Sequence, residues 1–204
     1  MPKRGGSRGR KKASLSNLSR QTLKPEHREE YAKELTGGSD RAAALVVAAE
    51  IDSYLIVILQ AKFFRLSEDE KDRLVFGQNA PLSNFASRIL VAYGLGLIDE
   101  AERDDLDRIR RIRNAFAHSV IPLTFDHDLI AKECSQLWYR NVYDKEMVSF
   151  GDPKARYLLT ALELRKIFMD RAVSSARSAA KSIKDRTRRK EYLAQIDAIL
   201  KRDT

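Results

Sequence analysis

One long apolar stretch decides the fold class of this chain: RAAALVVAAEIDSYLIVILQAKFF, residues 41–64. Its apolar side chains recur at helical spacing and cover more than one stripe, which predicts a central helix packed on several sides. Ser39 and Asp40, directly before it, form an N-cap signal. Because Glu50 and Asp52 interrupt the apolar run, we interpret it as a core helix and expect no membrane span.

The segments around this stretch predict further helices and no strand. Only 9 Gly and 5 Pro occur in 204 residues, which favours helices over a turn-rich β fold. Cap signals and apolar spacing place helices at about 25–35, 83–97, 99–118, 127–138 and 154–183, with a last one around 192–200. We therefore expect an all-α protein, a single bundle of about six or seven helices over residues 26–170. A disordered basic tail (1–25) and a basic helical extension (171–204) flank it.

Charge is distributed unevenly along the chain. The net charge is +9, but residues 1–25 hold eight Lys/Arg and no acid, and residues 171–204 hold ten Lys/Arg and four acids. The body between them holds 20 Lys/Arg and 25 acids, so a mildly acidic body carries two basic ends. Basic ends attract polyanions by neutralising phosphates. The alternative is that they only keep the chain soluble.

These basic ends supply the candidate residues for binding a nucleic acid, either DNA or RNA. They are Lys3, Arg4, Arg8, Arg10, Lys11 and Lys12 in the tail, and Arg186, Arg188, Arg189 and Lys190 in the extension. The rest of the chain lacks the usual cofactor motifs: it has no Walker A, GxGxxG or GxSxG sequence, and no HExxH. We therefore expect neither a metal nor a cofactor. A single cysteine, Cys134, and the absence of a signal peptide favour a reducing, cytoplasmic setting.

The strongest candidate for chemistry is DRIRRIRNAFAHS, residues 107–119, at the end of one predicted helix. Asn114 and His118, four residues apart, lie on the face opposite the apolar stripe. Arg113 lies at the edge of that stripe, about 140° around the helix from His118. The pair converges only if the last turn unwinds, or if a second copy completes the site across a homodimer.

Arg113, Asn114 and His118 together suit metal-independent RNA cleavage. A histidine acts as general acid or base near neutral pH, and an arginine stabilises charge in the transition state. Asn114 would position the phosphate or the histidine. The alternative is structural: arginines on a helix pair with carboxylates, here Asp104, Asp105 and Asp107, and a histidine is favoured at a helix C-terminus.

Five segments of the chain resemble the mannitol operon repressor (MltR) family. They are Ser39–Ala42 (SDRA), Phe76–Arg88 (FGQNAPLSNFASR), Ala92–Ile98 (AYGLGLI), Ile109–His118 (IRRIRNAFAH) and Asp152–Thr160 (DPKARYLLT). The resemblance covers roughly residues 38–170. It implies an all-helical domain with a role in negative transcriptional control. Because that family lacks an obvious DNA-binding domain, it also implies action through a partner.

The Arg-Asn-x-Phe-x-His element is in addition similar to the HEPN superfamily. This superfamily contains helical, often dimeric proteins, including metal-independent ribonucleases and toxin components. The resemblance implies that Arg113 and His118 would be catalytic, with Asn114 as the adjacent polar residue. Our leading hypothesis is a repressor acting through a protein or nucleic-acid partner. The alternatives are a HEPN-type endoribonuclease and a non-catalytic interaction module with nucleic-acid-binding tails.

Overall fold

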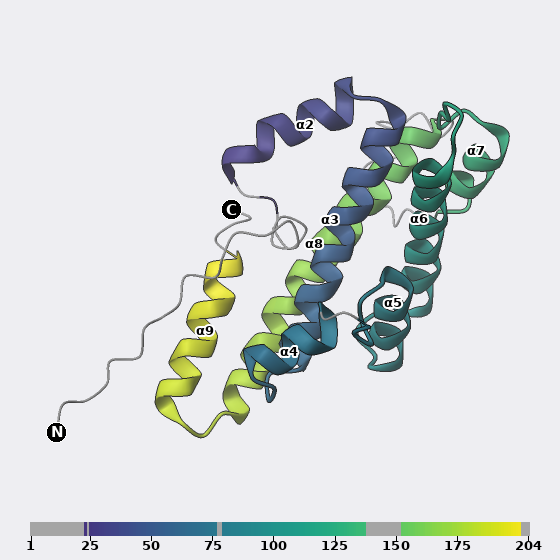
Figure 1. Ribbon diagram of the computed structural model, residues 1–204. Coiled ribbons are helices and arrows are strands. Elements are labelled where there is room, and N and C mark those ends of the chain that lie inside the picture. The colour runs from purple at the N-terminus through teal and green to yellow at the C-terminus, as the bar shows by residue number, and fades with distance from the viewer. Residues whose placement is uncertain (1–22, 24, 77–78, 138–151, 201–204) are drawn as a thin grey trace.

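The computed structural model describes residues 23, 25–76, 79–137 and 152–200 (Figure 1). These residues form eight α-helices and one 3-10 turn, and they contain no strand, which confirms the all-α prediction. The elements are η1 (Pro25–His27), α2 (Arg28–Gly37), α3 (Asp40–Lys62), α4 (Glu68–Val75), α5 (Phe85–Gly94), α6 (Glu100–His118), α7 (Asp128–Ser135), α8 (Pro153–Ser182) and α9 (Arg186–Leu200). Apart from Leu23 and Pro25, the predicted tail (1–25) lies outside the described residues.

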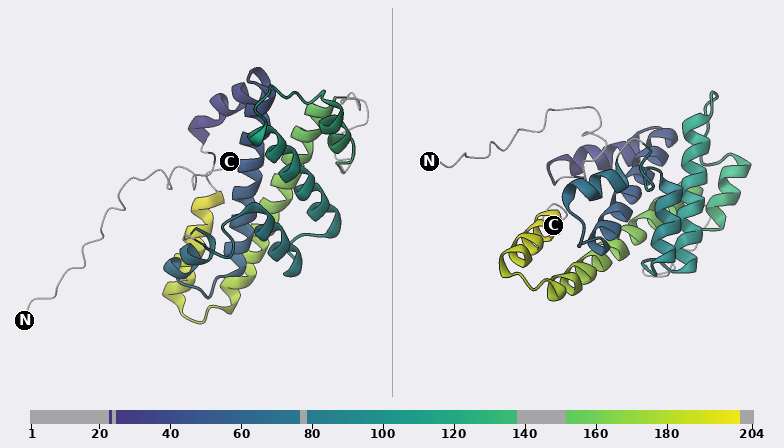
Figure 2. Two further views of the ribbon diagram at one scale, coloured as in Figure 1. Left: turned by 45° about the vertical axis from the view of Figure 1, so that its right-hand side comes forward. Right: turned by 60° about the horizontal axis from the view of Figure 1, so that its bottom comes forward.

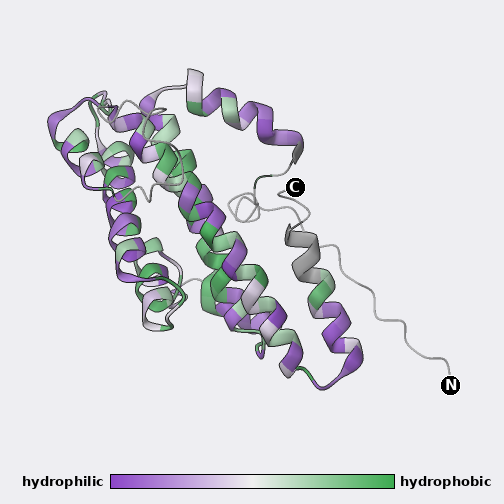
Figure 3. Cartoon of the chain, turned by 180° about the vertical axis from the view of Figure 1, so that it is seen from behind, coloured by the Kyte–Doolittle hydropathy of each residue, from purple (hydrophilic) through white to green (hydrophobic). Residues whose placement is uncertain are grey.

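The centre of the bundle is α3, which packs against α5, α6 and α8. Ile51, Leu55, Ile58 and Leu59 on this helix are at most 1 % exposed, and the helix is coloured as largely hydrophobic in Figure 3. By its length and its mean hydropathy of 2.1, α3 is long and apolar enough to cross a membrane. The described fold instead uses it as the core helix, and 56 % of its most apolar window is buried.

Helices α3 and α8 lie side by side and run in the same direction, as the views in Figures 1 and 2 show. The Tyr157 hydroxyl at the start of α8 donates to the Ala44 carbonyl near the start of α3, at 3.0 Å. Near the far end of α3, the Tyr192 hydroxyl from α9 donates to the Ala61 carbonyl at 3.2 Å. α9 thus packs on the bundle, and α8 runs through residue 170 without interruption.

Side-chain caps define most helix starts. The Ser39, Asn84, Asp99 and Asp152 side chains each accept a hydrogen bond from a backbone amide in the first turn of α3, α5, α6 and α8. The predicted end of α5 was wrong, because the helix stops at Gly94 rather than near residue 97. Gly96 adopts φ +65°, which glycine tolerates, and the Leu97 amide turns back to the Ala92 carbonyl at 2.8 Å.

Candidate functional site

Four arginines of α6 are paired with carboxylates. Arg103 contacts Asp104 at 3.0 Å, and Arg110 contacts Asp107 at 3.0 Å, both within the helix. Arg108 and Arg111 both reach Glu133 on α7, at 3.2 and 3.0 Å. The run that looks like a cationic surface in sequence is therefore largely neutralised in the fold, as the structural alternative predicted for Asp104 and Asp107.

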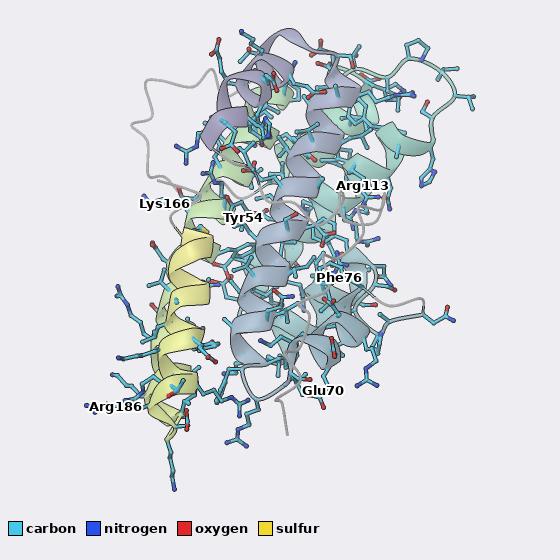
Figure 4. All side chains as sticks on the ribbon, turned by 60° about the vertical axis from the view of Figure 1, so that its left-hand side comes forward. Tyr54, Glu70, Phe76, Arg113, Lys166 and Arg186 are labelled. Carbon is cyan, nitrogen blue, oxygen red and sulfur yellow. The ribbon has the colours of Figure 1, made fainter. Side chains whose placement is uncertain are left out.

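Arg113, which is labelled in Figure 4, is half-buried. Its Nη1 donates to Asn114 Oδ1 at 3.0 Å. Its charge also acts on Asp52 of α3 and Tyr157 of α8, lowering the pKa of both groups against the larger effect of burial. Arg113 thus faces the core side of α6, and it shares in neutralising a carboxylate there.

His118 is exposed and is the last residue of α6. The helix remains regular through it, and the Ser119 amide closes the last turn on the Ala115 carbonyl at 3.1 Å. The last turn of α6 is therefore not unwound, so it does not bring His118 to Arg113. The structure joins Arg113 to Asn114, and the regular helix keeps His118 on a different side from Arg113, so completion by a second copy stays a prediction.

A buried ion pair that our sequence interpretation missed lies beside Arg113. Arg88 of α5 is 6 % exposed and reaches Asp52 Oδ2 at 2.5 Å. Its other nitrogens donate to the carbonyls of Leu82 (2.7 Å) and Ser83 (3.1 Å). The clue was present in the sequence, because a carboxylate inside an apolar helix needs a buried cation.

Burial raises the pKa of the Asp52 carboxyl above its ordinary value, although Arg88 and Arg113 both oppose that shift. Asp52 Oδ1 is buried and has no hydrogen-bond partner within the described segments. This cluster links α3, α5 and α6 through charge. The buried Arg88–Asp52 pair joins α5 to α3, and Arg113 of α6 lies near enough to add favourable charge.

At the C-terminal end of α6, Asp40 and Arg41 hold the following loop in place. Arg41 Nη2 donates to the carbonyls of Ser119 (2.7 Å) and Ile121 (3.1 Å). Asp40 accepts the Phe125 amide at 2.9 Å and pairs with Lys154 of α8 at 3.0 Å. Segments of the family resemblance that lie far apart in sequence thus meet at one end of the bundle.

This loop is braced, yet it exposes large apolar side chains. Val120 is 99 % exposed and Ile121 61 %, and Leu129 of α7 is 69 % exposed. Phe125, a few residues on, is buried between Phe116 and Tyr157, with ring centroids at 5.0 and 5.2 Å. The loop is anchored on both sides, so its exposed side chains are presented by a rigid segment.

The basic candidates separate into three groups. Lys3, Arg4, Arg8, Arg10, Lys11 and Lys12 lie outside the described residues. On α9, Arg186, Arg188 and Lys190 are exposed. Arg189 instead closes the C-terminus of α8, where its Nη2 donates to the Lys181 carbonyl at 2.9 Å and its Nε donates to the Ala180 carbonyl. No group of three or more metal-ligating side chains occurs within the part of the chain that is described.

Comparison with known proteins gives one match. No family model matches the chain, and no curated protein matches it either. A solved structure, described as the X-ray structure of the MtlR-HPr complex from Escherichia coli, superposes with a TM-score of 0.52 at 18 % identity. The superposition covers 70 % of this chain and 98 % of the matched chain. At this identity the match shows an MtlR-like fold, in agreement with the fold that the resemblance implied.

Proposed function

We propose that this chain is a negative transcriptional regulator that acts by binding a protein partner, with HPr as the first candidate. The carrying observation is the rigid, apolar loop at the end of α6, in a fold whose solved neighbour is described as a complex with HPr. Fully exposed apolar side chains are unfavourable in water, and they are more favourable where a partner covers them.

The arrangement of α6 supports a protein partner over direct nucleic-acid binding by this helix. Arg103, Arg108, Arg110 and Arg111 already contact carboxylates. A phosphate would have to replace those carboxylates, and it would also meet their negative charge. Most of the positive charge on the α6 surface is therefore already paired, although Arg108 and Arg111 share the single carboxylate of Glu133, which leaves little charge for phosphate binding.

The braced loop suits docking because its backbone is already ordered and would lose little conformational entropy on binding. Arg41 fixes two of its carbonyls, and the Ser119 hydroxyl donates to the Ile121 carbonyl at 2.8 Å. A preorganised segment loses less conformational entropy on binding than a flexible one. We assign Val120, Ile121 and Leu129 as the docking residues.

Titration calorimetry of the full chain with HPr from the same organism tests this proposal. We expect saturable binding, and the double variant Val120→Asp/Ile121→Asp should weaken it by about tenfold or more, as loss of central apolar contacts does. Leu162→Asp is the matched control, because Leu162 is an exposed apolar residue (45 %) on α8. It should bind like the wild type.

Two results would contradict different parts of the proposal. Absence of any HPr binding by the wild-type chain would remove HPr as the partner. Full binding by the double variant, with loss in Leu162→Asp, would place the interface elsewhere. In cells, the double variant should raise the same transcripts that deletion of the gene raises. An unchanged transcript profile in the deletion strain would contradict a repressor role.

A further inference from the structure

The end of the bundle opposite the α6–α7 loop gathers exposed positive side chains from three elements. We define the basic end by eight cations: Lys62 at the end of α3 and Arg65 just after it, Arg177 and Lys181 on α8, and Lys184, Arg186, Arg188 and Lys190 on the following turn and α9. All eight side chains are exposed. From this cluster, we propose that the basic end binds the phosphate backbone of nucleic acid without reading its sequence.

The basic end is held in place by contacts between α3, α8 and α9. Arg189 caps α8, the Tyr192 hydroxyl bonds to the Ala61 carbonyl, and the Phe64 and Tyr192 rings lie 6.4 Å apart. These contacts fix α9 against α3 and α8, so residues more than 100 positions apart in sequence share one surface. The sequence predicted a basic extension over residues 171–204, which contains six of the eight cations, and Lys62 and Arg65 join it through the tertiary fold.

The carboxylates that lie nearby in the sequence, on α4 and around the start of α9, do not pair with these cations in the described structure. The end of α8, the turn after it and the start of α9 form a helical hairpin, and two acids belong to it, Asp185 and Glu191. Asp185 is already used as the cap of α9, where it accepts the Arg188 amide at 2.6 Å. None of the eight cations forms an ion pair with a carboxylate that the structure describes, in contrast to the arginines of α6. Figure 3 shows the turn before α9 and its first turns as hydrophilic, and Figure 4 shows Arg186 at the outer end of this hairpin.

A hollow beside the cations supplies neutral hydrogen-bond donors. It lies between the end of α3 and α8, and its lining includes Lys62, Phe64, Ser174, Ser175, Ser178 and Ser182. Ser174 and Ser178 each lie three residues before a cation of the basic end, Arg177 and Lys181, and therefore on neighbouring positions of the helix surface. Proteins bind phosphate oxygens with the charged groups of lysine and arginine and with serine hydroxyl groups, among other donors.

The chemistry favours a nucleic-acid backbone over a membrane surface. No large exposed apolar side chain belongs to the basic end. Within the described residues those side chains lie on α5 and the turn after it, on the α6–α7 loop, on α7, and at Leu162 of α8. Stable attachment of a peripheral protein to lipid usually needs an apolar contribution besides charge. Cations spread over three elements instead suit a polymer that carries a regular series of phosphates.

The test is fluorescence anisotropy of the full chain with a labelled DNA duplex of about 25 base pairs, titrated between about 50 and 200 mM salt. The variant is Arg186→Glu/Arg188→Glu/Lys190→Glu. The matched control is Lys33→Glu/Lys132→Glu/Lys166→Glu, which makes the same charge change at exposed helical positions on α2, α7 and α8. Both keep residues 1–25, so any contribution of that tail is common to them.

We expect the hairpin variant to bind at least about tenfold more weakly, with a salt slope shallower by about 2 to 3, since each lost phosphate contact removes about 0.9. The control should lose much less. Circular dichroism melts check that both variants fold, and the glutamine version of the hairpin variant provides a milder change at the same positions. A shuffled duplex should bind equally well.

Two outcomes would overturn the proposal. Equal losses in the hairpin variant and the control would mean that net charge, and not this surface, sets the affinity. Displacement of the duplex by polyglutamate as effectively as by unlabelled duplex, at equal charge, would identify a surface for acidic proteins. The result is independent of HPr binding, so each proposal can fail while the other stands.

Discussion

Two arginine-rich regions of this molecule differ in what surrounds them. On α6, Arg108 and Arg111 converge on Glu133, while Arg103 and Arg110 take carboxylates of their own helix. At the basic end, Arg186, Arg188 and Lys190 are exposed and have no carboxylate partner among the described residues. Similar side chains therefore serve two purposes, joining helices in one region and leaving positive charge unpaired in the other.

The comparison shows that local charge density in sequence is a weak guide to a nucleic-acid surface. What matters is whether the fold brings carboxylates to the cations, because a paired cation has little remaining attraction for phosphate. The denser run, on α6, is the more neutralised one. Four changes test this difference, beginning with the one expected to have the largest effect.

The largest effect should come from Arg171→Met, which removes a cation that joins α8 to α6. Arg171 Nη2 contacts Glu102 at 2.8 Å, and Nη1 also donates to the Leu97 carbonyl at 2.8 Å. Because Glu102 is only 3 % exposed, its carboxylate would remain buried without a cation, with the Asp99 amide still bonded to it. We expect the free energy of unfolding to fall by about 3 kcal/mol in urea denaturation.

Lys181→Met, on the same helix, is the control for that change. Lys181 is exposed and unpaired in the described structure, so stability should change by no more than about 0.5 kcal/mol. Equal losses in both variants would erase the distinction between paired and unpaired cations.

A smaller effect, dependent on pH, should appear at Asp52. Burial raises its folded-state pKa above the ordinary 3.8, so the folded protein binds this proton more tightly than the unfolded chain does. The contribution of Asp52 to stability therefore declines as pH rises from about 3.8 through the raised pKa. Relative to the wild type, Asp52→Asn should become progressively more stable over that window.

Urea denaturation at a series of pH values measures this difference. Asp69→Asn on α4 is the control at an exposed carboxylate, and the same change with pH in this variant would mean that burial is not the cause of the effect at Asp52. A stability difference for Asp52→Asn that moves in the opposite direction with pH would mean that Arg88 and Arg113 outweigh burial.

The third change removes the α6–α7 ion pairs. In Arg108→Ala/Arg111→Ala, both partners of Glu133 are lost, but these side chains are a quarter to a half exposed. Stability should fall by at most about 1 kcal/mol, and duplex affinity should stay close to that of the wild type. A larger loss of duplex affinity than in the hairpin variant would reverse the comparison.

The smallest expected effect concerns RNA cleavage. Arg113 is bonded to Asn114, and the regular last turn of α6 keeps His118 away from it. We expect labelled RNA to stay intact with the purified protein in EDTA, and Arg113→Ala and His118→Ala to match the wild type. Cleavage by the wild type that disappears in both variants would instead support the ribonuclease alternative and a site completed by a second copy.

The local elements of the fold were predictable because their signals are local. Ser39, Asn84, Asp99 and Asp152 mark helix starts in sequence and serve as caps in the structure. The end of α5 was misplaced, because apolar spacing continues to Leu97 although Gly96 turns the backbone. Within the candidate site, the angle between positions on an ideal helix predicted Arg113 and His118 on different sides, and the regular last turn of α6 keeps them there.

The amino-acid sequence by itself determined that the chain is helical, where most helices begin, and that its charge gathers at the ends. Each of these depends on neighbours within a few residues. Only the tertiary structure decided which cations are neutralised, because Glu133 is more than 20 residues from Arg108 and Arg111, and Asp52 is 36 residues from Arg88. Ion pairing depends on distance in space, which helix packing sets. The same packing assembled the basic end from α3, α8 and α9.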